Sequence, residues 1–306
     1  MADLRGAQEG DDSALSQAER NLCELPCPSI ALADGGMGPA ASRLASGFDL
    51  VLVSEQDLAL VLETVSRAPL ASMALVQLLR QSVGMSIHEG LLAESLAYST
   101  LQSGPEFAAW LANRPASTGQ NGPEGQGPAV LVSRQGHCLR LRLNRPRRCN
   151  AFSVEMRDCL AAALALAASD RELTEIVLDA EGPAFCAGGD LDEFGSLPDP
   201  ATAHAVRSAL SVARLLARCG PRLHVRVHGA CVGAGAELAA FARRVTARAD
   251  AYFELPEVGM GLVPGAGGTV SLARRIGRQK TAYWALSGLR LDAPTALAWG
   301  LVDDLD

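Results

Sequence analysis

The chain has 306 residues, of which 48% are hydrophobic and 20% charged, and its formal net charge is -7. No apolar run approaches the roughly 20 residues that a membrane-spanning helix needs, so the sequence argues against an integral membrane protein. The negative charge argues against a general nucleic-acid binder, which neutralises phosphates with Lys and Arg. Residues 1–12 are polar and acidic and lack the apolar segment of a secretory signal, so we expect a cytoplasmic protein.

Eight cysteines are distributed over the chain without a C-x-x-C pair, the spacing typical of zinc sites and redox dithiols. We therefore expect no metal centre, and thiols that are reduced and buried. Aromatic residues make up only 4% of the chain, and this favours closely packed aliphatic α/β layers.

Residues 116–128 are rich in Gly, Gln and Pro and have little to bury, which predicts a flexible linker between two halves of the chain. Upstream, residues 57–115 have apolar side chains at three- and four-residue spacing, which predicts a helical region. Residues 1–56 form an N-terminal extension, and neither upstream segment carries obvious chemistry. The helices are expected at residues 57–65, 70–83, 89–101 and 107–112.

Residues 129–306 alternate strands with helices, the pattern of an α/β fold. Residues 129–132 and 139–143 predict an antiparallel hairpin around Gly136. The same pattern predicts a helix over 153–169, strands over 175–179 and 223–228, and one continuous helix over 201–218.

Three glycine-rich turns, at residues 185–191, 229–239 and 262–269, each precede a helix in this pattern. The second turn lacks the third glycine of a dinucleotide-binding fingerprint, because Leu238 stands at that position. Glu254 lies at the distance where such sites place an acid, but it cannot replace the missing glycine. We therefore expect no nicotinamide site.

Five motifs in residues 129–306 occur in an order that is more specific than any one of them. Together they resemble the enoyl-CoA hydratase/isomerase (crotonase) superfamily. The resemblance implies a crotonase-like spiral of ββα units with an associated helical region, and homotrimers or homohexamers. It also implies an acyl-CoA substrate and no cofactor, since coenzyme A is part of the substrate. The motifs lie at residues 144–151, 185–191, 229–239, 253–269 and 300–302.

Two glutamates and two alanines carry the chemistry that the resemblance implies. Glu237 and Glu257 match the pair that the family's hydratases use around one water, and carboxylates in different surroundings can divide into acid and base. Ala187 and Ala234 match positions whose backbone N–H groups form an oxyanion hole for the thioester oxygen. The alternatives are simple turn geometry for the alanines, a solvated helix residue for Glu237, and a capping or ion-paired group for Glu257.

Two turns supply the residues that the resemblance assigns to substrate binding. Arg147 and Arg148 follow a strand, where the family's basic residues approach the phosphates of coenzyme A, and charge-assisted contacts would hold those phosphates. The alternative is an ordinary solvated basic loop. The turn at residues 185–191 contributes Ala187, Gly189, Asp190 and Leu191.

The front half of the chain departs from the family pattern. Family members continue past the Gly-Leu-Val motif into three or four helices, whereas here residues 57–115 resemble those helices and precede the core. A circular permutation would explain this order and would place the start of these helices near Asp306. Alternatively, residues 28–51 faintly repeat the strand and helix around Glu237, with Arg43 at the glutamate position. The front would then be a decayed crotonase remnant that keeps only its helices.

The presence of both glutamates favours hydration of a 2-enoyl-CoA to a 3-hydroxyacyl-CoA, because family isomerases resemble the same scaffold with only the second acid. The fold supports several reactions, so an isomerase, an acyl-CoA hydrolase and a cofactor-independent oxygenase remain alternatives. A non-catalytic acyl-CoA-binding subunit is the alternative from a different class.

Overall fold

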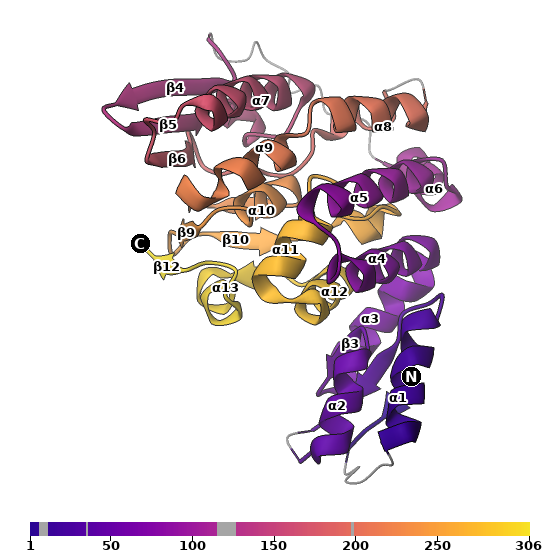
Figure 1. Cartoon of the computed structure of the whole chain (residues 1–306). Helices are drawn as coiled ribbons and strands as arrows, with labels where there is room; N and C mark the ends of the chain where they lie inside the picture. Colours follow the sequence, from indigo (N-terminus) through magenta and orange to yellow (C-terminus); the bar gives the residue numbers. More distant parts are fainter. Residues whose placement is uncertain (6–11, 35, 115–126, 197–198) are drawn as a thin grey trace.

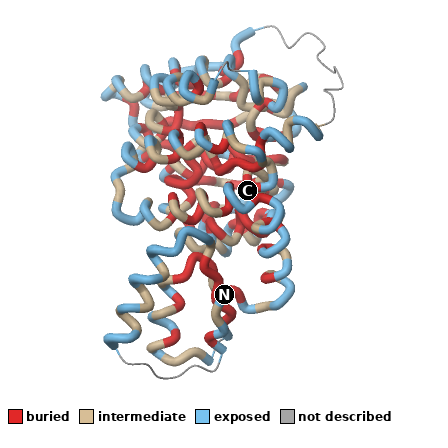
Figure 2. The backbone as a smooth tube through the Cα atoms, turned by 90° about the vertical axis from the view of Figure 1, so that its right-hand side faces the viewer, coloured by how far each residue is buried: buried red, intermediate tan, exposed pale blue. Residues whose placement is uncertain are grey.

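The computed structural model describes residues 1–5, 12–34, 36–114, 127–196 and 199–306, and Figure 1 shows their arrangement. The linker predicted over 116–128 lies outside the described residues, apart from Gly127 and Pro128. One hydrophobic cluster extends along the sequence from Ile30 to Val302, so the two halves of the chain share a core. Figure 2 shows this buried core in the middle of the molecule.

The largest of the three sheets in the described residues has the strand order β12-β9-β7-β6-β5-β4. Its neighbouring strands are parallel except in the predicted β4–β5 hairpin, which turns at Gly136 with a φ of 59°. In β5 the leucines are buried, whereas Arg140 and Arg142 form ion pairs with Asp179. The strands are β4 (Val130–Gln135), β5 (Cys138–Leu143), β6 (Glu175–Ala180), β7 (Leu223–Val227), β9 (Arg244–Ala247) and β12 (Asp304–Leu305).

A smaller sheet, β11-β10-β8, positions two of the three glycine-rich turns. Strand β8 (Ala230–Val232) is parallel to β10 (Tyr252–Glu254), and β11 (Leu291–Asp292) is antiparallel to β10. Because parallel strands end at the same edge of a sheet, the segments that follow β8 and β10 lie side by side.

Helices and short 3-10 helices cover both sheets. The helix predicted over 201–218 is wrong as one element, because the chain forms α8 (Pro200–Ala209) and α9 (Val212–Cys219). Between them, the Ser211 side chain accepts a hydrogen bond from Arg214 N at 3.2 Å and starts a new helix. The remaining helices of this half are α7 (Val154–Ser169), α10 (Ala234–Ala239), α11 (Gly268–Ile276), α12 (Arg278–Ser287), α13 (Ala293–Trp299), η1 (Pro146–Arg148), η2 (Leu191–Glu193), η3 (Gly220–Arg222) and η4 (Glu257–Met260).

The predicted helical region consists of four helices that pack on this half. Helix α4 contacts α11 and α12, and α5 contacts α8, α9 and α11. Within the described residues no single helix is long and apolar enough to cross a membrane; α3 and α4 pass such a test only as a pair bent by 111°. The helices are α3 (Glu55–Arg67), α4 (Pro69–Ser82), α5 (Ile87–Gln102) and α6 (Pro105–Asn113).

The C-terminal strand β12 and the first of these helices, α3, lie at opposite sides of the molecule in Figure 1. The expectation that the helical region begins beside Asp306 is therefore wrong.

The N-terminal extension is a small α/β lobe with its own core of Leu4, Ala31, Ala45 and Phe48. It keeps strands as well as helices, contrary to the expectation for a remnant. Cys23 and Cys27 are exposed, so the expectation of buried thiols is wrong for these two. Arg43 pairs with Asp12 at 2.9 Å and Glu19 at 2.8 Å. The elements are β1 (Ala2–Asp3), α1 (Asp12–Glu24), β2 (Ile30–Leu32), α2 (Pro39–Gly47) and β3 (Leu50–Leu52).

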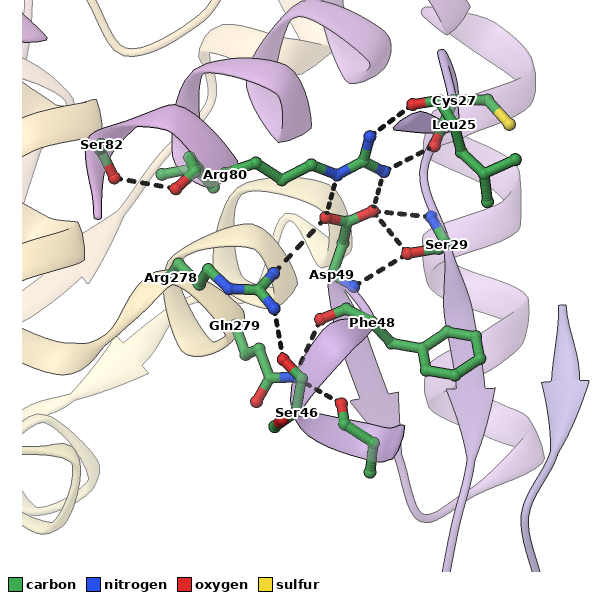
Figure 3. A network of polar contacts seen from close by, with 12 residues as sticks. Leu25, Cys27, Ser29, Ser46, Phe48, Asp49, Arg80, Ser82, Arg278 and Gln279 are labelled. Carbon is green, nitrogen blue, oxygen red and sulfur yellow. Dashed lines mark hydrogen bonds and ion pairs between the residues drawn. The ribbon is translucent and has the colours of Figure 1, made fainter. Parts of the chain in front are cut away.

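A buried aspartate attaches this lobe to the rest of the molecule (Figure 3). Asp49 is 2% exposed, and its carboxylate accepts a hydrogen bond from Arg80 Nε of α4 at 2.8 Å. The same carboxylate lies 3.5 Å from Arg278 Nη1 of α12 and accepts from Ser29 N at 2.8 Å. Asp49 therefore links three parts of the fold.

Replacing Asp49 should destabilise the fold. We expect Asp49→Ala to lower the free energy of unfolding by about 3 to 5 kcal/mol, because two largely buried arginines lose their shared counter-ion. Urea unfolding followed by circular dichroism measures this. The matched control is Asp3→Ala, which breaks the exposed pair with Arg5 and should leave the unfolding midpoint nearly unchanged. Equal losses in both variants would contradict the role of Asp49.

Candidate active site

The two predicted glutamates lie at the carboxyl ends of neighbouring parallel strands. Glu237 is in α10, directly after β8, and Glu257 begins η4, shortly after β10. Between β8 and α10 the chain turns at Gly233, which has a φ of 48°. A Cβ atom at Gly233 would lie 2.2 Å from Glu257 Oε1, so this turn needs glycine both for its conformation and for the approach of Glu257.

Glu237 is 1% exposed and is not the solvated helix residue of the alternative interpretation. Its Oε2 accepts hydrogen bonds from Ala266 N at 2.7 Å and Gly268 N at 2.8 Å. Burial, together with repulsion from Glu257 and Glu94, raises the pKa of Glu237 well above its ordinary value.

The Glu257 side chain reaches the same region. Its Oε2 is buried and has no hydrogen-bond partner within the described residues. Burial raises the pKa of Glu257 to about 7, with a smaller contribution from Glu94. A buried carboxyl oxygen without a partner is a group that substrate or water can engage.

A third carboxylate, Glu94 of α5, was missed by the sequence analysis, which found no chemistry in the helical region. Glu94 is 2% exposed and accepts hydrogen bonds from Gly267 N at 2.7 Å, Thr269 N at 2.9 Å and Thr269 Oγ1 at 2.6 Å. Burial raises its pKa to about 7. The available signal was an acid on an otherwise apolar stripe, since Leu91, Glu94, Tyr98 and Leu101 share one helix face.

The turns that carry Ala187 and Ala234 are brought together by backbone hydrogen bonds. Cys186 N donates to Ala230 O at 3.0 Å, and Val232 N donates to Cys186 O at 2.9 Å. Ala234 is the first residue of α10, and the first N–H groups of a helix have no acceptor within it. The Ala187 N–H donates to Cys149 O at 2.9 Å, so this donor already has an acceptor in the structure.

The residues predicted to bind coenzyme A lie around η1 and η2. Arg148 is partly exposed and pairs with Asp190 at 3.1 Å and Asp192 at 2.7 Å, whereas Arg147 is exposed. Asp190 is 5% exposed, and its side chain accepts from Asp192 N at the start of η2.

The other two predicted binding positions differ in exposure. Gly189 faces the Phe194 ring, which a Cβ atom would approach to 2.8 Å. Leu191 is 43% exposed. Glu254 pairs with Arg290 away from this group. In the described part of the chain, no group of three or more His, Cys, Asp or Glu side chains could hold a metal ion.

Comparisons with known proteins identify the family. A family model described as enoyl-CoA hydratase/isomerase matches residues 133–306. The chain is 39% identical over 176 residues to the 2,3-dehydroadipyl-CoA hydratase of Escherichia coli (strain K12), a match that covers 58% of this chain and 68% of that protein. It is 35% identical over 197 residues to a mevalonyl-coenzyme A hydratase of Beauveria bassiana, covering 59% and 69%.

Solved structures give the same result. The enoyl-CoA hydratase from Thermoplasma volcanium is 34% identical with a TM-score of 0.54, and the match covers 59% of this chain and 73% of that one. The enoyl-CoA hydratase of Mycobacterium smegmatis is 31% identical with a TM-score of 0.55, covering 58% and 70%. The chain therefore belongs to the enoyl-CoA hydratase/isomerase family, and the predicted crotonase-like α/β fold is confirmed. Within this family it is a hydratase-like acyl-CoA enzyme.

The raised pKa of Glu94 predicts a pH-dependent stability. Its carboxyl group ionises at about 7 in the folded protein and at its ordinary value of 4.5 in the unfolded chain. The folded state therefore keeps a proton that the unfolded state loses, and the free energy of unfolding should fall between about pH 4.5 and pH 7.

Glutamine resembles the protonated acid, so the free energy of unfolding of Glu94→Gln should equal that of the wild type at pH 5. Between pH 5 and pH 8 this free energy should fall less than it does in the wild type. Urea unfolding at both pH values measures this. The control is Glu63→Gln on the exposed face of α3, in which the free energy of unfolding should fall with pH as much as in the wild type. An unchanged fall in Glu94→Gln would show that Glu94 does not titrate in this window.

Proposed function

We propose that this protein adds water across the double bond of a 2-enoyl-CoA thioester and gives a 3-hydroxyacyl-CoA. The observation that carries the proposal is the pair of buried carboxylates, Glu237 and Glu257, which approach each other from adjacent strand ends and both have a raised pKa. Interacting carboxylates lose their protons in separate steps, so around neutral pH one can act as an acid while the other acts as a base.

The division of roles follows the family resemblance. Glu237 is fixed through Oε2 by two backbone N–H groups, and its Oε1 would take a proton from the attacking water. The water oxygen then bonds to the β-carbon, and the electron pair of the double bond moves toward the thioester oxygen. Glu257, with its unpartnered Oε2, would give its proton to the α-carbon. The result is the addition of one water molecule.

Backbone N–H groups would stabilise the enolate oxygen that develops in this reaction. Ala234 supplies a donor at the start of α10, where the helix dipole favours negative charge. For Ala187 to be the second donor, the thioester oxygen must share or replace its bond to the Cys149 carbonyl. Arg147 and Arg148, with the turn from Gly189 to Leu191, would hold coenzyme A.

The remaining parts of the proposal rest on the family resemblance. The reaction moves only protons and water, so it needs no cofactor beyond the coenzyme A of the substrate. Assembly into homotrimers or homohexamers and a cytoplasmic location complete the proposal. Two relatives that are named as hydratases support hydration over isomerisation.

Glu257 should be essential for turnover. We expect wild-type protein to hydrate crotonyl-CoA, measured as loss of the conjugated-thioester absorbance, and Glu257→Gln to lower kcat by at least about 100-fold with little change in acyl-CoA binding. The control is Glu254→Gln, which removes a carboxylate that pairs with Arg290, and turnover should stay near that of the wild type. Near-normal turnover of Glu257→Gln would remove Glu257 from the mechanism, and an inactive wild type would favour a binding subunit.

Replacing Glu237 should slow hydration more than it slows the exchange of α-protons with solvent. If it activates water, Glu237→Gln should suppress hydration more than the exchange of α-protons of a saturated acyl-CoA with solvent, because exchange needs only Glu257. Nuclear magnetic resonance in deuterated water measures the exchange. Equal loss of both reactions would indicate a shared structural role instead.

A further inference from the structure

Two adjoining cavities lie between α5, α8 and α9. The first, about 70 Å³, is bounded by the loop residues Gly265, Ala266 and Gly267, and by the apolar side chains of Phe152 and Leu238. Because Ala266 lines this cavity and its N–H donates to Glu237 Oε2, the cavity begins near Glu237. The second cavity, about 90 Å³, extends toward the outer ends of α5, α8 and α9. The two share the lining residues Leu91, Ser95, Arg207 and Ser211.

Arg207 lines both cavities and has only neutral hydrogen-bond partners. Its Nε donates to Ser95 Oγ at 3.2 Å and its Nη1 to Gln102 Oε1 at 3.2 Å, and the guanidinium lies 4.7 Å from the centre of the Tyr98 ring. Among the described residues no carboxylate lies within 4.0 Å of it to form an ion pair. The charge of Glu94 acts on Arg207 from beyond ion-pair distance and compensates only part of its burial. A partly buried cation without a paired carboxylate is costly. This cost is recovered when an anion binds beside it.

Two further polar atoms in the second cavity lack partners. Arg214 Nε and Ser208 Oγ are both buried, and neither has a hydrogen-bond partner within the described residues. The nearby acid Glu94 lines the first cavity only, and both of its oxygens already accept hydrogen bonds from Gly267 and Thr269. The outer cavity is therefore lined by two arginines, by Ser208 and by His88, and the guanidinium and hydroxyl donors match the planar oxygens of a carboxylate.

We propose that Arg207 and Arg214 bind a carboxylate at the far end of the acyl group. The preferred substrates are then 2-enoyl-CoA thioesters whose acyl chain ends in a second carboxylate, with the apolar part of the chain along Phe152, Leu91 and Leu238. This inference rests on the proposed function, because it takes the cavity beside Glu237 as the acyl-binding site.

The test compares two substrates of equal length. These are trans-2-hexenoyl-CoA and the analogue in which a carboxylate replaces the terminal methyl group. We expect wild-type kcat/KM to be about 10- to 100-fold higher for the carboxylated substrate, since hydrogen bonds to charged groups contribute on this scale. Arg207→Met and Arg214→Met should bring the ratio of the two kcat/KM values close to one. The ratio is insensitive to the fraction of folded protein, because misfolding lowers both values equally.

The matched control is Arg218→Met, on the exposed side of α9, which should keep the wild-type ratio. Calorimetry with hexanoyl-CoA and hexanedioyl-CoA reports binding alone, because these saturated thioesters are not hydrated. Wild type and Arg218→Met should bind hexanedioyl-CoA more tightly than hexanoyl-CoA, whereas Arg207→Met and Arg214→Met should not. Tighter binding of hexanedioyl-CoA, without hydration of either 2-enoyl-CoA substrate, would overturn the proposed hydratase activity and support the carboxylate site. Hydration with equal kcat/KM values, unchanged in Arg207→Met, would overturn the carboxylate site and support the hydratase. Absence of both binding and hydration would overturn both.

Discussion

Four successive N–H groups, in the loop before α11 and in the first turn of that helix, bond alternately to two buried carboxylates, and the proposed site depends on this arrangement. Ala266 and Gly268 donate to Glu237, whereas Gly267 and Thr269 donate to Glu94. The loop leads into α11, whose positive end thus meets two acids, which compensates part of their burial. Because one acid belongs to the core and the other to α5, this loop joins the two halves of the chain at the point where the chemistry is proposed.

Small residues make the close approach possible. A Cβ atom at Gly265 would lie 2.3 Å from the Tyr98 ring, and one at Gly268 would lie 2.6 Å from Glu237 Cγ. The loop backbone therefore contacts α5 on one side and α10 on the other. This packing buries the acids, and burial raises the pKa values of Glu94 and Glu257 to about 7. The helical region is in this sense part of the site.

The N-terminal lobe contacts helices that in turn pack against α11. Asp49 holds Arg80 of α4, and Gln279 of α12 donates to the carbonyl oxygens of Ala45 and Phe48 at 2.9 Å. The position that faintly corresponds to Glu237 holds Arg43, which forms ion pairs within the lobe. The lobe therefore supports α4 and α12, and these in turn pack against α11.

The sequence by itself determined the family, the α/β core and the positions of Glu237 and Glu257, because these lie in glycine-rich turns whose chemistry is local. It could not determine that α8 and α9 are separate helices, since the Ser211 cap interrupts a continuous apolar pattern. Glu94 was also beyond its reach, because apolar periodicity shows which face of a helix is buried and not what covers it. Only the tertiary structure placed Glu94 against Gly267, 173 residues away, and left Arg207 facing a cavity without a counter-ion.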